Sequence, residues 1–254
     1  MLRIHRLVPI CFAAVALGIE SIAAAPLTPK QNVQAAGTVL LALYRTSPET
    51  IRTLFVPHVT NAYFPLVPGT TFVYQGAKEG VPTRNEMRVT HTVTRILGVD
   101  CTTVRDRAFE NNVLVEDTFD WYAQDVAGNV WYFGEDTKEL DEKGRVISTA
   151  GTWKAGVDGA APGIIMLAHP QVGDLYYQEF AAGVAEDTAR VRNLSSSGCV
   201  PFGCFDRLLK TTETNRLEPD AVENKYYARH VGFVRGVMTA GGSEHTELVR
   251  ITHE

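Results

Sequence analysis

Cysteine is scarce in this sequence, with 4 residues among 254. A chain of this size therefore depends on a hydrophobic core rather than on a dense disulfide framework. Beyond residue 23 there is no apolar run of the about 20 residues that a membrane-spanning helix needs. Basic residues are not in excess, since 24 Lys and Arg stand against 29 Asp and Glu. We therefore expect no nucleic-acid partner and no integral membrane segment once the N-terminal region is removed.

The local motifs of several enzyme classes are also absent. The sequence contains no G-x-S-x-G, no H-E-x-x-H and no G-x-x-x-x-G-K-[ST]. These absences disfavour a serine hydrolase and a nucleotide-dependent enzyme. The acidic run 135–142 does not follow the spacing of a calcium loop, and its end is typical of a simple turn.

The composition is that of a globular protein, with 45% hydrophobic and 21% charged residues. Residues 1–23 form a pattern of their own. Arg3 and Arg6 precede an apolar run of about 13 residues, which is too short to span a bilayer. Small residues at Ser21 and Ala23 then fit a cleavage site, so we expect a signal peptide that is cut after Ala23 and a periplasmic or secreted product.

Three cysteines remain after that cut. Cys199 and Cys204 are separated by Val-Pro-Phe-Gly, a turn-like spacer, and in an oxidising compartment they can form a disulfide. Cys101 opens a strand pattern, so we expect a buried thiol.

The mature chain begins with a helical pattern and continues as strands. Apolar residues recur at helical spacing within 30–56. From Tyr63 onward, short alternating stretches are punctuated by Gly, Asn and Pro at hairpin intervals. We therefore expect an N-terminal helical segment over 24–62 and one antiparallel β domain over 63–254. The fold class is all-β, a single curved sheet or a barrel-like domain with an N-terminal helix.

A candidate site emerges from the hairpin over 100–124. With Asn111-Asn112 as a two-residue turn, Asp106 lies opposite Asp117 on the more apolar face. Two facing carboxylates need a shared proton, a cation or a basic neighbour. A turn at Gly98-Val99 in the preceding hairpin then sets His91 opposite Asp106.

This row of His91, Asp106 and Asp117 supports two kinds of chemistry. A histidine with two carboxylates is a ligand set for a divalent metal, the one cofactor that the row indicates. It is also an acid–base set, with His91 as base, Asp106 as its orienting partner and Asp117 as acid. A three-residue loop closed by Gly128 then adds the next strand to the same face. This strand and its neighbour supply an aromatic and acidic wall that we expect to bind ligand, formed by Trp121, Trp131, Phe133 and Glu135.

Two other interpretations of the row remain open. The three side chains could form a buried hydrogen-bond network without a ligand. A slip of one residue would instead pair Arg105 with Asp117 as an ion pair and turn Asp106 to the other face. His169 could lean over the sheet as a further ligand-binding residue, although a loop position in solvent is the alternative. Glu186-Asp187 follows Gly183 and is typical of a solvated edge.

Three stretches resemble known proteins. They are Y-F-P-L-V-P-G-T-T-F-V-Y-Q-G at 63–76, V-E-D-T-F-D-W-Y-A-Q-D-V-A-G-N-V-W-Y-F-G-E-D at 115–136, and E-N-K-Y-Y-A-R-H-V-G-F-V at 223–234. The chain resembles exported bacterial all-β proteins of unknown function, and the E-D-T-F-D-W-Y-A-Q-D stretch is the most specific part. The resemblance implies export and an all-β fold, and it implies no activity.

Three functions are compatible with this sequence. The first is an exported protein that binds a small-molecule ligand or a divalent metal on the concave face of its sheet. The alternative is a metal-assisted or cofactor-independent hydrolase, lyase or isomerase that uses the His-Asp-Asp row. The third is a structural protein of the cell envelope.

Overall fold

The structure is a computed structural model, and residues 32–254 are described. The predicted signal peptide at 1–23 lies outside the described residues. These residues form two helices followed by strands that all pair antiparallel, so the expected all-β fold with an N-terminal helix is confirmed. The helices are α1 (Asn32–Thr46) and α2 (Pro48–Thr53), and neither of them is long and apolar enough to cross a membrane.

The strands belong to a 16-stranded sheet whose main path runs β10-β12-β13-β14-β15-β16-β2-β3-β4-β5-β6-β9-β11. Short strands β1, β7 and β8 pair with β5 or β6 beside this path. The strands are β1 (Phe55–Val56), β2 (Thr70–Lys78), β3 (Val81–Ile96), β4 (Val99–Glu110), β5 (Val113–Asp125), β6 (Val130–Leu140), β7 (Val146–Ser148), β8 (Trp153–Lys154), β9 (Ala161–Met166), β10 (Leu175–Tyr177), β11 (Glu179–Phe180), β12 (Asp187–Val200), β13 (Gly203–Asn215), β14 (Glu218–Ala228), β15 (Gly232–Ala240) and β16 (Glu244–His253).

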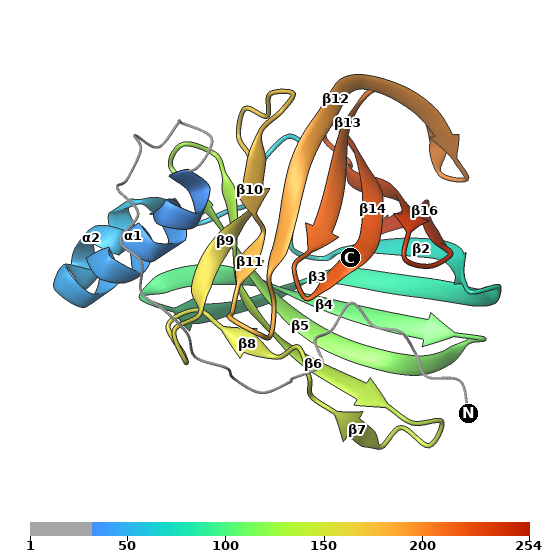
Figure 1. Ribbon diagram of the computed structural model, residues 1–254, viewed down its shortest axis with the longest axis horizontal. Coiled ribbons are helices and arrows are strands. Elements are labelled where there is room, and N and C mark those ends of the chain that lie inside the picture. The colour runs from blue at the N-terminus through green and yellow to red at the C-terminus, as the bar shows by residue number, and fades with distance from the viewer. Residues whose placement is uncertain (1–31) are drawn as a thin grey trace.

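The sheet curls until it nearly closes on itself. Strands β12–β14 run steeply across β3–β6 and enclose an interior (Figure 1). The two ends of the path meet in one short stretch of chain. Strand β10 pairs with β12, whereas β11, which follows β10 after Gln178, pairs with β9. The backbone N–H of Gln178 donates to the carbonyl oxygen of Asp187 at 2.8 Å. Residues 175–180 therefore form the seam of the sheet.

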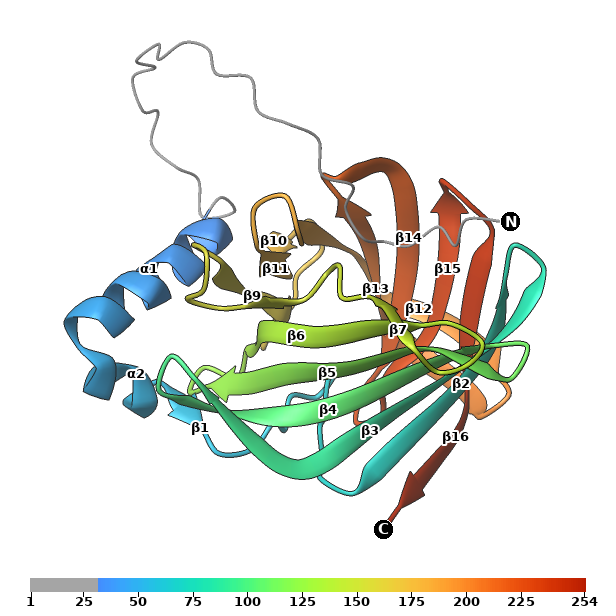
Figure 2. The ribbon, with the colours of Figure 1, turned by 90° about the horizontal axis from the view of Figure 1, so that it is seen from below.

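Helix α1 packs beside β9 at one end of the sheet (Figure 2). Gly37 allows this contact, since a side chain at that position would collide with the carbonyl oxygen of Pro162. Leu40 is buried, whereas Val39 and Tyr44 are exposed. The helix thus turns one apolar stripe toward the sheet, as the spacing of its apolar residues predicts.

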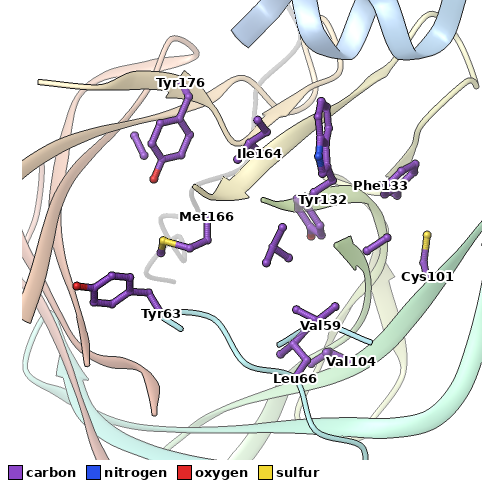
Figure 3. Close-up of a cluster of buried hydrophobic side chains, with 14 of the residues drawn as sticks. Val59, Tyr63, Leu66, Cys101, Val104, Tyr132, Phe133, Ile164, Met166 and Tyr176 are labelled. Carbon is purple, nitrogen blue, oxygen red and sulfur yellow. The ribbon is translucent and has the colours of Figure 1, made fainter. Parts of the chain in front are cut away.

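The loop between β1 and β2 fills part of the interior. Its Val59, Tyr63 and Leu66 are buried and lie among side chains of the surrounding strands (Figure 3). Asn61 holds the loop in place, because its side-chain amide donates to the carbonyl oxygens of Gly128 at 2.8 Å and Leu167 at 3.1 Å. Burying a polar side chain is tolerable only with such partners. The expected β domain therefore takes part of its core from a segment without secondary structure.

Candidate functional site

The predicted His-Asp-Asp row does not form, because the register of two hairpins differs from the prediction. The Asn111-Asn112 turn is correct, with both residues at positive φ. A β-bulge between Ala108 and Phe109 then shifts the pairing of β4 and β5 by one residue. Asp106 consequently lies opposite Thr118, and Asp117 lies opposite Arg107 on the other face of the sheet.

Asp117 is paired with arginine on the outer side. The Arg105 guanidinium donates to both of its carboxylate oxygens, each at 2.7 Å. The slipped register predicted an ion pair of these two residues, but in a different pairing. It placed Arg105 directly opposite Asp117, whereas Arg105 lies opposite Phe119 and reaches Asp117 diagonally, and it is Asp117 and not Asp106 that turns outward. Asp117 is therefore not available to the interior of the sheet.

His91 is separated from both carboxylates. The turn before β4 uses Leu97 and Gly98, both at positive φ, and not Gly98-Val99. A second irregularity between Val89 and Val93 removes His91 from regular pairing, and Met87 takes the position opposite Asp106. The His91 side chain is exposed, beside Gly69. Among residues 32–254, no group of three or more His, Cys, Asp or Glu side chains is arranged to hold a metal ion.

The predicted aromatic wall divides between two faces. The three-residue loop closed by Gly128 is correct, and Ala123 pairs with Trp131 as expected. A bulge at Gly134, where φ is +129°, then places Glu135 on the same face as Tyr132. Trp121, Trp131 and Phe133 lie on the opposite face, where Phe55 makes edge contacts with the rings of Trp131 and Phe133.

The remaining predicted residues lie away from the interior. His169 is exposed in the loop that follows β9. Cys199 and Cys204 form a disulfide between paired positions of β12 and β13, and Cys101 is a buried free thiol, as predicted. The disulfide lies near the tip of its hairpin, where Cys199 lines a small separate pocket of about 80 Å³.

The structure instead brings polar residues of four strands and the seam around a cavity of about 210 Å³, to which β9 and β15 add one apolar residue each. A single water molecule needs only about 10–15 Å³ measured in this way. Of the residues proposed from sequence, only Glu135 lines this cavity. Its lining comprises Tyr132, Glu135, Ile165, Gln178, Glu179, Asp187, Glu213, Thr214, Asn215, Ala221, Val222, Glu223, Lys225 and Met238.

Lys225 is the one basic side chain in this lining, and two carboxylates hold it. Its ammonium lies 2.8 Å from Glu213 and 3.6 Å from Glu223. Glu213 also accepts hydrogen bonds from Thr211 at 2.9 Å and from the Tyr227 hydroxyl at 3.2 Å. Burial by itself would lower the pKa of Lys225, but the two glutamates raise it well above its usual range. Lys225 therefore stays charged and neutralises part of the acidic lining.

A second pair of carboxyl groups lies at the seam. Glu179 of β11 hydrogen-bonds to Asp187 of β12, and the indole N–H of Trp153 donates to Glu179 at 2.9 Å. Burial, the hydrogen bond with Asp187 and the nearby charges of Asp187 and Glu135 raise the pKa of Glu179 well above its usual range. The Glu179 carboxyl group therefore favours its protonated form beside Asp187.

Further acidic groups continue along the interior beyond the cavity. Burial is the main cause that raises the pKa of Asp106 to about 6 and that of Asp120 to about 8. Asp106 accepts a hydrogen bond from the Asn85 amide at 3.0 Å, and Asp120 accepts one from the Tyr132 hydroxyl at 2.6 Å. Stacking of Tyr132 on Tyr122, at 4.8 Å between ring centres, keeps this hydroxyl in place. The concave face is thus acidic and aromatic, with tyrosines in place of the predicted tryptophans.

Most of the residues that line the cavity were not predicted from the sequence. Glu186-Asp187 reads as a solvated edge, yet Glu186 is 1% exposed and Asp187 lines the cavity. The alternation of Glu213 with Thr211 and of Glu223 with Lys225 was a usable signal, because each pair puts polar groups on one face of its strand. Which face of these two strands points inward could be known only from the curl of the sheet.

Two crystal structures of bacterial proteins are similar to this chain. A protein from Bacteroides fragilis, named as exported and with a YmcC-like fold, gives a TM-score of 0.45 at 13% identity over 78% of this chain and 99% of its own. A protein from Parabacteroides distasonis, named as a lipoprotein, gives a TM-score of 0.41 at 11% identity over 76% of this chain and 99% of its own. Neither name includes a ligand or a reaction. No family model and no curated protein matches the sequence.

Proposed function

We propose that this chain is an exported protein that binds a small polar molecule in the cavity between β6, the seam and β12–β15. The observation that supports this proposal most directly is the cavity itself, about 210 Å³ in volume and lined by charged, amide and hydroxyl side chains together with four apolar ones. Most solvent-facing sheets bury apolar residues inward, whereas this one directs Glu179 and Glu213, each 7% exposed, into its interior. Burying charge in this way costs stability and is typical of functional sites.

Export is supported by the signal-like pattern of residues 1–23 and by the disulfide, which suits an oxidising compartment. An enzyme built on His91, Asp106 and Asp117 together finds no support in the observed register, since the three side chains do not meet. Binding without turnover requires only a shaped, polar cavity with fixed partners. The hydrogen bonds on Glu213 and Glu179 supply such fixed partners.

The experiment is a melting screen of the mature protein against neutral, anionic and cationic small molecules. A ligand that binds only the folded state raises Tm, and at 100 times its Kd it adds about 2.7 kcal/mol. Met238 lies at the rim of the cavity and is not part of the carboxyl network. Met238→Trp is therefore expected to remove the shift by filling the rim, because the larger ring occupies the space of the ligand.

Thr239→Trp is the matched control, since Thr239 is exposed on the same strand and does not line the cavity. The proposal predicts that this variant keeps the shift. It fails if every compound that stabilises the wild type stabilises Met238→Trp equally.

A further inference from the structure

We propose that the ligand of this cavity carries an ammonium group, which binds between the carboxyl groups of Glu179 and Asp187 at the seam. This inference rests on the proposed function and adds the chemical class of the ligand and the proton exchange that accompanies binding. The bond that breaks is the O–H bond of the Glu179 carboxyl group, whose proton passes to the buffer. The ammonium keeps its own protons and donates them to the two carboxylates.

Charge is the first argument. The carboxyl groups that line the cavity or lie against Glu179 come from four strands and the seam, and Lys225 is the single cation among the lining residues. Lys225 is already engaged with Glu213 and Glu223. Among the described residues, no basic side chain forms an ion pair with Glu179 or Asp187. A positively charged ligand would supply that missing partner, and hydrogen bonds between charged groups are about twice as strong as neutral ones.

Position is the second argument. The Trp153 indole fixes one oxygen of Glu179, and the backbone hydrogen bond from Gln178 to Asp187 fixes the spacing of the two strands. The pair is therefore preorganised at the seam and does not need to be assembled when a ligand enters. Preorganised partners reduce the entropy that binding costs.

An unsatisfied hydroxyl beside this group is the third, independent argument. Tyr176 is 2% exposed, and within residues 32–254 its hydroxyl has no hydrogen-bond partner. The side chain points into the interior of the sheet (Figure 3), and it interacts electrostatically with Glu213 and Lys225. A buried hydroxyl without a partner costs about 1–3 kcal/mol. Tyr176 does not itself line the cavity, so a ligand satisfies this hydroxyl where it extends past the lining residues Glu213 and Lys225.

The proton balance gives the proposal a distinctive signature. The groups that act on Glu179 are Asp187 from β12 and Glu135 from β6, and Glu213 from β13 and Glu223 and Lys225 from β14 line the same cavity. Burial and the contacts with Asp187 and Glu135 raise the pKa of Glu179, so its carboxyl group favours the protonated form and an incoming cation expels the proton. Binding should therefore release about one proton and should tighten as pH rises, until the ligand amine itself loses charge.

The experiment is isothermal titration calorimetry of the mature protein with 1,4-diaminobutane as the probe. Its neutral and anionic counterparts, 1,4-butanediol and succinate, are titrated in parallel. Repeating the titration in phosphate and in MOPS, whose ionisation enthalpies differ and neither of which carries a primary ammonium group, counts the protons released. We expect the diamine to bind at least about tenfold more tightly than the diol, which corresponds to about 1.4 kcal/mol. We also expect release of about one proton at pH 7.

The decisive variant is Glu179→Gln. The amide resembles the protonated carboxyl, since it can still accept from Trp153 and donate to Asp187, so the fold should survive. We expect at least about a tenfold loss of diamine affinity and no proton release. Asp106→Asn is the matched control, because Asp106 is an acid of the same interior that does not line the cavity. This variant should leave the diamine affinity and the proton release unchanged.

The outcomes separate this inference from the proposed function. If the diol or succinate binds as tightly as the diamine, or if Glu179→Gln binds the diamine with unchanged affinity and proton release, the ammonium is excluded and a cavity for another ligand remains. If the diamine does not bind, the inference is overturned as well, and the melting screen with Met238→Trp still decides the function.

Discussion

Lys225 and Glu213 form an ion pair inside the sheet, with 2.8 Å between the ammonium nitrogen and a carboxylate oxygen. The Glu213 side chain is 8% exposed and that of Lys225 is 31% exposed. Lys225→Met should destabilise the fold by about 3 kcal/mol, because it leaves Glu213 buried without its cation. Urea unfolding at pH 7 measures the loss. The double variant Glu213→Gln, Lys225→Met should recover much of it, and a loss below about 1 kcal/mol for the single variant would contradict this role.

Tyr176→Phe should not destabilise the unliganded protein. The Tyr176 hydroxyl has no partner among the described residues, so its removal is expected to leave the free energy of unfolding unchanged or to raise it by about 1 kcal/mol. Tyr227→Phe is the matched comparison, since the Tyr227 hydroxyl donates to Glu213, and its loss should cost about 1 kcal/mol. Tyr176→Phe should nevertheless weaken 1,4-diaminobutane binding about three- to tenfold by calorimetry. Equal losses of stability in the two variants would show that Tyr176 is also hydrogen-bonded.

Stability should fall as the pH rises from about 4 to about 8. Burial raises the pKa of Asp106 to about 6 and that of Asp120 to about 8, whereas a carboxyl group in the unfolded chain titrates near 4. The folded state therefore binds more protons than the unfolded state over this window, and the free energy of unfolding decreases with pH. Urea unfolding at pH 5 and pH 8 should differ by at least about 2 kcal/mol.

Asp120→Asn provides the control for this pH dependence. The amide oxygen still accepts from the Tyr132 hydroxyl but does not titrate, so the difference between pH 5 and pH 8 should shrink. A wild-type protein that is more stable at pH 8 than at pH 5 would show that the interior carboxyl groups are not buried as described.

Asp117→Asn tests the register of β4 and β5. Its side chain is 21% exposed and that of its partner Arg105 is 38% exposed, so breaking the pair should cost no more than about 1 kcal/mol. Diamine binding should be unchanged, because Asp117 lies on the outer face. A large loss of binding in this variant would place Asp117 in the interior, as the simple hairpin register predicts.

The fold class followed from the sequence because strand periodicity and turn chemistry are local. The turns at Asn111-Asn112 and Gly128 were identified from residues that tolerate positive φ. Strand β9 carries no such local signal, since its sequence, A-P-G-I-I-M, contains Pro and Gly and makes no alternating pattern.

The site was harder to predict because β-bulges decide which side chains share a face. The bulges beside Ala108 and at Gly134 each move the following residues to the opposite face, so Asp117 turned outward and Glu135 inward. Such bulges accommodate the curl of the sheet, which depends on contacts between distant strands. The seam that joins Glu179 to Asp187 is likewise a product of that closure, and no pattern near either residue indicates it.

The most direct test of the binding account is a crystal structure of the mature protein soaked with saturating 1,4-diaminobutane at pH 7.5. The account predicts continuous density for the diamine in the cavity, with one nitrogen within about 3.2 Å of a carboxylate oxygen of Glu179 or Asp187. Ordered water alone in the cavity, with the diamine bound elsewhere or not at all, would contradict it.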